Sequence, residues 1–375
     1  MPDATPDALT NGLLPIASQF VRQGQVTQIQ PLGNGNINDT FLVRVDAART
    51  DTCFVLQRLN TQVFPCPQQV MHNIHIYTEH VRQRLVHSPP AESRRWEIPR
   101  VLLTQTGQNG WLSPEGSFWR ALSFIPQALT VETLQTREQA QEVGFGLGMF
   151  HTLISDLPPE QLADTLVGFH IAPRYLQQYE TVLAALPETA EAQYCYTFIA
   201  ARQAQIGVLE QAKQRGKLPL RSIHGDPKVN NILFDKATRQ AISLVDLDTI
   251  KPGLVHYDIG DCLRSGCNLL GEETDRWQTV RFELDLCESM LQGYCAIANA
   301  FLTPADYAYL YDAIWLLPYE LGLRFFTDYL AGDVYFKTTY AKHNLARALV
   351  QFKLVESIEA QESAIRAIIQ ALCKG

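Results

Sequence analysis

Two short apolar runs, residues 231–234 and 241–245, flank the polar stretch 235–240, and this arrangement constrains the fold of the chain more than any other feature. Apolar runs on both sides of a polar turn predict a β-hairpin. Because a hairpin returns the chain beside itself, Asn231 at the start of one strand and Asp246 after the other become spatial neighbours. The hairpin therefore brings two polar clusters, residues 224–231 and 246–248, into one small volume.

The side chains of these two clusters suit the transfer of a phosphoryl group. Asp226 can accept a hydrogen bond from an attacking hydroxyl and take its proton, while Lys228 can carry positive charge toward the phosphate. Asn231 and Asp246 offer the hard oxygen ligands that Mg²⁺ takes alongside phosphate oxygens and water. We therefore expect Asp226 and Lys228 to be catalytic, Asn231 and Asp246 to hold Mg²⁺, and ATP to complete the metal site.

Each residue alone has a simpler interpretation. An H-G-D tripeptide is usually a turn, and Asp246 and Asp248 alone would be ordinary residues at a strand end. Their joint occurrence across a hairpin favours catalysis. His224 is expected to brace the loop by hydrogen bonding rather than to react. Two interpretations stay open for Asp248, which is either a second magnesium ligand or a residue facing water.

The order of secondary structure predicts an α+β fold of two lobes. Residues 10–24 indicate an entry helix, and from residue 26 to about 124 the sequence is strand-rich, with one helical stretch whose apolar positions recur every three or four residues at 68–85. After a proposed hinge at 120–127, helical patterns dominate. They cover residues 137–155, 174–186, 191–215, 277–300, 305–330 and 340–372. His151 is expected to be a core or capping residue.

A glycine-rich segment near the N-terminus is the candidate nucleotide loop. Gly33 and Gly35 lie between two predicted strands, where exposed backbone N–H groups can approach a phosphate closely. An ordinary hairpin turn has the same composition. These two glycines are the expected backbone contacts to ATP.

The next predicted strand, residues 54–60, contains no lysine. Arg58 is the expected phosphate-binding residue, since a guanidinium group binds phosphate bidentately. Another register of the strand would put Gln57 in the site, and Arg58 would then be a surface residue. Glu79 on the predicted helix is the conceivable ion-pair partner of the cation.

The composition of the chain indicates which kinds of partner it binds and where in the cell it is located. The chain has 375 residues, of which 46% are hydrophobic, enough for two sizeable cores. Its formal charge of -8 gives no general attraction to nucleic acid or anionic membranes, so we expect neither as a partner and a small molecule as the substrate. Without a basic N-terminal segment, a long apolar stretch or cysteines at zinc spacing, the expected location is the cytoplasm.

Residues 224–231 resemble the catalytic loop of protein kinases, H-R-D-x-K-x-x-N, with Gly225 in the arginine position, and Asp246 stands where the D-F-G aspartate would. The H-G-D form is more similar to the aminoglycoside phosphotransferase and choline kinase superfamily. That resemblance implies a bilobal protein-kinase-like fold, with a β-rich N-lobe over residues 1–126 and a mostly helical C-lobe over residues 127–375. The third glycine of the kinase pattern is absent, and Asn38 stands at its place.

Several phrases from residue 33 to beyond residue 335 look like one branch of this superfamily, the N-acetylhexosamine 1-kinases. They are residues 35–41 (GNINDTF), 55–60 (VLQRLN), 225–231 (GDPKVNN), 246–249 (DLDT), 257–261 (YDIGD), 322–330 (GLRFFTDYL) and 332–335 (GDVY). The resemblance implies transfer of the ATP γ-phosphate to the anomeric hydroxyl of N-acetylglucosamine or N-acetylgalactosamine, in the presence of Mg²⁺.

The same resemblance implies that Asp226 contacts the sugar and that Arg324 and Tyr335 bind it. An arginine can donate several hydrogen bonds to sugar oxygens, and a tyrosine can stack on the ring. Two alternatives stay open, because Arg324 can pair with Asp328 four residues along a helix and Tyr335 can be a core residue.

The segment 257–264 completes the predicted active site. Asp258 is expected to brace the catalytic loop, which is the usual use of an aspartate at this place in the superfamily. Either Asp261 or Arg264 is expected to line the substrate side, and the sequence leaves both open.

Two other functions remain open at this point. The same fold can act on another acceptor, such as an amino alcohol, another sugar or an aminoglycoside, for which the cation-binding candidates are Asp275, Glu283, Asp285 and Glu288. The chain can also be a nucleotide-binding homologue without catalysis, an interpretation that rests on the missing strand lysine alone.

Overall fold

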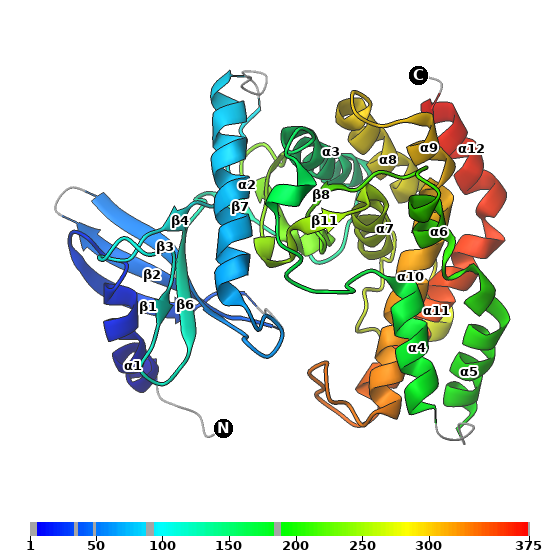
Figure 1. Ribbon diagram of the computed structural model, residues 1–375, viewed down its shortest axis with the longest axis horizontal. Coiled ribbons are helices and arrows are strands. Elements are labelled where there is room, and N and C mark those ends of the chain that lie inside the picture. The colour runs from blue at the N-terminus through cyan, green and yellow to red at the C-terminus, as the bar shows by residue number, and fades with distance from the viewer. Residues whose placement is uncertain (1–5, 34–36, 48–49, 88–93, 184–188, 374–375) are drawn as a thin grey trace.

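The computed structural model describes residues 6–33, 37–47, 50–87, 94–183 and 189–373. It consists of a β-rich N-lobe, at the left of Figure 1, and a larger helical C-lobe at the right. This arrangement confirms the predicted α+β fold with two lobes. The expected lobe boundary at residue 126 lies between the last strand of the N-lobe sheet and the first strand of the C-lobe.

The N-lobe is built on one antiparallel sheet with the strand order β1-β2-β3-β6-β4, in which β5 pairs with β6. Its strands are β1 (Gln25–Pro31), β2 (Asp39–Ala47), β3 (Thr50–Leu59), β4 (Val101–Leu102), β5 (Trp111–Leu112) and β6 (Phe118–Ser123). Helix α1 (Pro6–Ser18) covers one face, where Leu13 and Ala17 pack against Phe54 and Leu56 of β3. Because side chains alternate along a strand, Gln57 points to the opposite face.

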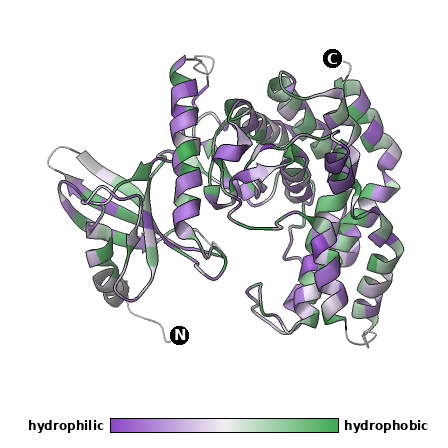
Figure 2. Ribbon diagram, in the orientation of Figure 1, coloured by the Kyte–Doolittle hydropathy of each residue, from purple (hydrophilic) through white to green (hydrophobic). Residues whose placement is uncertain are grey.

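Helix α2 (Pro67–His87) joins the two lobes. Its buried face includes Val70, Ile74 and Val81, which belong to the large core of the C-lobe, and Figure 2 shows the helix striped with hydrophobic and hydrophilic residues. The Asn73 Nδ2 donates to the carbonyls of Ala163 and Ile250, both at 2.8 Å. Glu79 pairs with Arg82 on the same helix and is not the partner of Arg58, which pairs with Asp39.

The C-lobe contains ten helices longer than one turn among the residues described. They are α3 (Arg137–Leu153), α4 (Ala172–Val182), α5 (Ala190–Arg202), α6 (Val208–Gln214), α7 (Val255–Gly266), α8 (Leu284–Ala298), α9 (Pro304–Ala308), α10 (Leu310–Leu330), α11 (His343–Ala360) and α12 (Glu362–Cys373). The prediction of one continuous helix at 191–215 is wrong, because a 3₁₀ turn (Gln203–Gln205) and Gly207, the N-cap of α6, interrupt it. In the part of the chain described, no helix is long and apolar enough to cross a bilayer.

The predicted hairpin is present. Strands β9 (Ile232–Asp235) and β10 (Ala241–Leu244) pair antiparallel, and β7 (Ala128–Leu129), the first strand after the expected hinge at residues 120–127, adds to β9. A second pair consists of β8 (Arg221–Ile223) and β11 (Lys251–Gly253). The catalytic-loop sequence therefore lies between β8 and β9, at the side of the C-lobe that meets the N-lobe (Figure 1).

Helices α3 and α8 cross at glycines that allow their backbones to touch. A Cβ atom on Gly144 would lie 1.8 Å from the carbonyl oxygen of Met290, and one on Gly293 would lie 2.0 Å from that of Gln141. Backbone atoms in packed helices cannot move aside as a side chain does. The two helices therefore need glycine at both positions.

We expect Gly144→Ala to lower the free energy of unfolding of the C-lobe by about 3 kcal/mol, because separating the helices costs more than the roughly 1 kcal/mol that alanine gains over glycine in a helix. Urea denaturation followed by circular dichroism measures this change. The matched control is Gly12→Ala in α1, where a Cβ atom has open space, and this variant should be at least as stable as wild type. Equal stability of Gly144→Ala and wild type would contradict the proposed helix crossing.

Candidate active site

The hairpin places the two candidate metal ligands side by side. The Val245 N–H donates to the Asn231 carbonyl at 2.9 Å, so Asp246 emerges next to Asn231. Asp246 has a left-handed backbone (φ 65°, ψ 60°), which is uncommon for a residue other than glycine and is typical of functional sites. This conformation turns the chain sharply out of β10 and leaves the Asp246 side chain exposed in the cleft.

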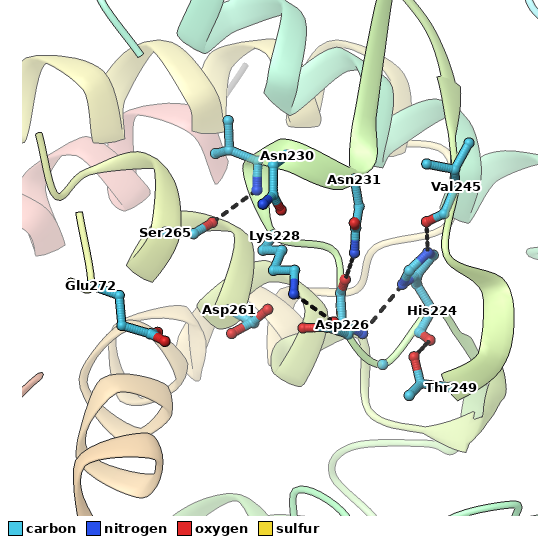
Figure 3. Close-up of polar contacts among 12 residues, drawn as sticks. His224, Asp226, Lys228, Asn230, Asn231, Val245, Thr249, Asp261, Ser265 and Glu272 are labelled. Carbon is cyan, nitrogen blue, oxygen red and sulfur yellow. Dashed lines mark hydrogen bonds and ion pairs between the residues drawn. The ribbon is translucent and has the colours of Figure 1, made fainter. Parts of the chain in front are cut away.

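The Asn231 side chain has its oxygen available for a cation. Its Nδ2 donates to the backbone carbonyl of Asp226 at 2.8 Å (Figure 3), which orients Oδ1 away from that contact. The protein around the Asp246 carboxylate removes part of its hydration, and this raises its pKa; the negative charge of Asp248 raises it further. A cation bound there would relieve this unfavourable charge. The pair Asn231 and Asp246 therefore fits magnesium, which keeps several positions for phosphate and water.

Other clusters of metal-binding side chains are missing from the described residues, which contain no group of three or more His, Cys, Asp or Glu able to hold an ion. A site with only two protein ligands agrees with a metal that enters together with a nucleotide.

The two candidate catalytic side chains face the same space. The Lys228 ammonium lies 3.4 Å from the Asp226 carboxylate, and both side chains are about one-third exposed. The Asp226 charge, against the effect of burial and with help from Asp246, Glu272 and Asp261, raises the pKa of Lys228 far above its usual range. Lys228 is therefore charged at any physiological pH.

The loop that carries Asp226 is held by a buried carboxylate on α7. Asp258 accepts hydrogen bonds from the backbone N–H groups of His224 (2.7 Å) and Gly225 (2.8 Å) and from the ring of His151 on α3 (2.8 Å). Burial alone would raise the pKa of Asp258, but these donors hold it below its usual range. Asp258 braces the loop as expected, and His151 is a core residue.

His224 braces the loop as well. Its Nδ1 accepts from the Asp226 N–H at 3.2 Å, and its Nε2 therefore donates to the Val245 carbonyl at 3.0 Å (Figure 3). Burial lowers the pKa of His224, in agreement with this neutral ring. The next residue, Gly225, has φ +90°, and a Cβ atom there would lie 2.6 Å from the Thr249 carbonyl, so no other residue fits.

Sequence reasoning missed a second brace, formed by His170 and Glu320. The His170 Nε2 donates to the Gly225 carbonyl at 2.7 Å, and its Nδ1 lies 3.0 Å from the Glu320 carboxylate. Burial opposes a charge on the ring, yet the Glu320 carboxylate outweighs it and raises the pKa of His170. The two residues lie far apart in sequence, and neither belongs to a motif.

The structure corrects the expectation for Arg58. Its side chain is 50% exposed, its Nε donates to Asp39 at 2.8 Å, and it lies over the ring of Trp119 on the face that α1 covers. The alternation of side chains along β3 is the physical reason, since it sends Arg58 to one face and Gln57 to the other. Gly33 has a positive φ of 71°, while Gly35 lies outside the described residues.

Neither interpretation of Asp248 is correct. The side chain is 3% exposed and does not face water; it accepts a hydrogen bond from Asn38 Nδ2 at 2.6 Å and pairs with Arg120 at 2.5 Å. Both partners belong to the N-lobe. Asp248 therefore connects the two lobes, and its oxygens are not free for a second magnesium ion.

Of the two candidate sugar-binding residues, Arg324 lies near the C-terminal end of α10 and Tyr335 in the loop that follows it. The Arg324 guanidinium lies among the rings of Phe169, Tyr175 and Phe336, at 5.2, 4.9 and 5.4 Å from their centres. It has no carboxylate partner among the residues described. Burial disfavours its charge, but Tyr175, Tyr335, Glu320 and Asp226 together raise the pKa of Arg324.

Asp328 has other partners than Arg324. It accepts hydrogen bonds from the backbone N–H groups of Val334, Tyr335 and Phe336, at 2.9, 2.8 and 2.9 Å, and thereby fixes the loop after α10. Tyr335 itself is 52% exposed, so it is not a core residue. Both alternatives raised from the sequence are therefore wrong.

Asp261 and Arg264 on α7 form an ion pair with each other. The Arg264 guanidinium is held between Asp261 Oδ1 (2.8 Å) and Glu272 (3.2 Å). The second oxygen of Asp261 is buried and has no hydrogen-bond partner in the described structure. Asp261 lies near Asp226 and Lys228 in Figure 3, and both Asp261 and Arg264 are buried.

Solved structures share this architecture. A choline kinase from Cryptosporidium parvum Iowa II has a TM-score of 0.60 at 13% identity, covering 97% of this chain and 99% of that one. An aminoglycoside phosphotransferase from Alicyclobacillus acidocaldarius has a TM-score of 0.58 at 14% identity and covers 95% of each chain. A Plasmodium vivax ethanolamine kinase has a TM-score of 0.54 at 12% identity, covering 86% of this chain and 82% of that one. At these identities the likeness concerns the fold, and it confirms the protein-kinase-like architecture.

The sequence itself matches the family described as "Phosphotransferase enzyme family" over residues 28–286. This range covers well over half of the chain and includes the loop of Asp226 and the hairpin to Asp246. Arg324 and Tyr335 lie beyond it. The prediction of a phosphotransferase is confirmed, and the chain belongs to the phosphotransferase enzyme family.

Proposed function

We propose that the enzyme transfers the γ-phosphate of ATP to the anomeric hydroxyl of an N-acetylhexosamine, N-acetylglucosamine or N-acetylgalactosamine, and releases the sugar 1-phosphate. One observation carries the proposal. The Arg324 cation has no carboxylate partner among the described residues, and it lies over the ring of Phe336, which packs against the exposed Tyr335. The resemblance of residues 322–330 and 332–335 to N-acetylhexosamine 1-kinases supports the same acceptor.

The chain's own residues perform the transfer in the following way. Asp226 accepts a hydrogen bond from the acceptor hydroxyl and takes its proton as the new O–P bond forms and the bond from the γ-phosphorus to the β,γ-bridging oxygen breaks. Lys228 neutralises charge on the transferring group. Asn231 and Asp246 would hold Mg²⁺, which supplies charge neutralisation on the nucleotide phosphates when it is bound.

The charge of Arg324 favours a neutral acceptor. Arg324 can donate several hydrogen bonds to hydroxyl and amide oxygens of a sugar, and a free guanidinium repels a quaternary ammonium or an aminoglycoside. Among the acidic residues considered for a cationic acceptor, Asp285 lies on the surface of α8 and pairs with Arg137 of α3.

A homologue without catalysis is less consistent with the geometry. Asp226, Lys228, Asn231 and Asp246 converge, and two independent braces hold the loop that carries the first of them. A protein that only bound nucleotide would not need the braces that position Asp226.

Asp226→Asn should lower kcat by about 10²- to 10⁴-fold, since the amide cannot take the proton, and should leave ATP affinity within about twofold of wild type. Coupled detection of ADP release and calorimetric titration of ATP measure the two effects. Asp285→Asn on α8 is the control for loss of a carboxylate and should keep full activity. Near-normal kcat in Asp226→Asn would contradict the assignment of Asp226 as the catalytic base.

Arg324→Lys should raise KM for N-acetylhexosamines at least about tenfold, because lysine keeps the charge but loses the fork of donors. KM for ATP should stay within about twofold. Steady-state kinetics with N-acetylglucosamine, N-acetylgalactosamine, glucose, galactose, choline and an aminoglycoside measures the effect and ranks the acceptors. The control is Arg137→Lys on the surface of α3, which should change neither KM. Efficient turnover of choline without any turnover of N-acetylhexosamines would contradict the proposed acceptor.

A further inference from the structure

The cleft face of the N-lobe sheet receives its positive charge from a strand other than β3. Arg58 points to the outer face, and the residue that β3 turns toward the cleft is the neutral Gln57. Directly opposite Gln57, in the pairing of β3 with β6, stands Arg120. Directly paired residues on neighbouring strands share one face of the sheet, so Arg120 lies on the cleft side.

The Arg120 side chain is held in one orientation. It is 1% exposed; its Nε donates to Gln57 Oε1 at 2.9 Å, and its Nη2 lies 2.5 Å from Asp248 Oδ1. Both partners are themselves fixed, since Gln57 Nε2 donates to Thr40 Oγ1 at 3.0 Å and Asp248 accepts from Asn38. The guanidinium group is therefore positioned from two sides before any ligand binds.

The third nitrogen of this guanidinium lacks a partner. Arg120 Nη1 is buried and makes no hydrogen bond within the described structure. A buried donor without an acceptor is unfavourable, more so when it is charged, and is uncommon in folded proteins. An oxygen of a bound anion would satisfy it.

The position of Arg120 identifies this anion. Its ion-pair partner Asp248 is two residues from Asp246, which fits a magnesium ligand. An anion that brings Mg²⁺ to Asp246 therefore comes within reach of the Arg120 charge. The phosphates of a nucleoside triphosphate meet this description.

We propose that Arg120 binds the nucleotide phosphates through Nη1, with Gln57 and Asp248 as its positioning residues. This inference rests on the proposed function, because it assumes that ATP enters the cleft. It explains how the cleft binds phosphate without a lysine on β3. It also gives Asp248 a role, which is to hold the N-lobe cation beside the catalytic loop of the C-lobe.

Nucleotide titrations of the full chain test the inference. Calorimetry with ATP, ADP and adenosine in the presence of Mg²⁺ is applied to wild type, Arg120→Met, Arg120→Lys and the matched control Arg58→Met from the same sheet. Arg120→Met should lose about tenfold to hundredfold in affinity for ATP and ADP, as expected for loss of a charge-assisted contact. Adenosine affinity should stay within about twofold. Arg120→Lys should lie between Arg120→Met and wild type, and Arg58→Met should match wild type.

Unchanged ATP affinity in a folded Arg120→Met protein, or a loss confined to Arg58→Met, would overturn the inference. An equal loss for adenosine would overturn it too, since it indicates a damaged cleft and not a lost phosphate contact. If the Arg120 variants do not fold, crystals of the wild type soaked with a non-hydrolysable ATP analogue and Mg²⁺ decide. Nη1 should then lie within about 3.2 Å of a phosphate oxygen, and a phosphate held by another cation, with Nη1 still unpaired, would overturn the inference. Wild type that binds no ATP at all would instead contradict the proposed function.

Discussion

The buried carboxylate of Asp258 is the interaction on which the active site depends. An isolated charge at this depth would cost several kcal/mol, and the carboxylate is tolerated because it accepts hydrogen bonds from His151 and from the two backbone N–H groups that begin the catalytic loop. These contacts tie α3, α7 and the loop together. The position of Asp226, one residue further on, is thus determined by the packing of the C-lobe core and not by the loop itself.

A second constraint sets the cleft between the lobes. Asp248 on the C-lobe and the N-lobe residues Asn38 and Arg120 form one buried polar network, and Asn73 of α2 holds the carbonyl of Ile250 close by. Buried polar groups that lose their hydrogen-bond partners are costly. If the lobes separated at this edge, several of these groups would become exposed or lose their partners. The network therefore keeps the nucleotide side of the cleft aligned with the catalytic loop.

Local sequence patterns predicted the parts of the structure that local forces determine. Polar turns between apolar runs indicated β9 and β10, and the period of apolar residues indicated α2 and α3. The resemblance of residues 224–246 to kinase loops pointed to Asp226 and Asn231. The expected helix 191–215 contains a conflicting signal, Gly207, and in the structure α5 ends at Arg202 and α6 begins at Val208.

The remaining features depend on contacts between distant segments, which no local pattern encodes. Arg58 satisfied the chemistry of phosphate binding, but the register of β3 turned it outward, and the cation came from β6. His170 and Glu320 brace Gly225 from elements distant in sequence. Asp328 stood at the right spacing for Arg324, yet three backbone N–H groups of the following loop bind it instead, and this leaves Arg324 to its aromatic neighbours.

The identity of the phosphorylated product tests the central claim most directly. The purified enzyme is incubated with ATP, Mg²⁺ and N-acetylglucosamine or N-acetylgalactosamine, and the product is examined by proton-coupled ³¹P NMR. Transfer to the anomeric hydroxyl predicts a phosphomonoester signal coupled to the anomeric proton of the sugar. A phosphate on another hydroxyl of the sugar, or ATP consumption only with an amino alcohol, would contradict an anomeric sugar kinase.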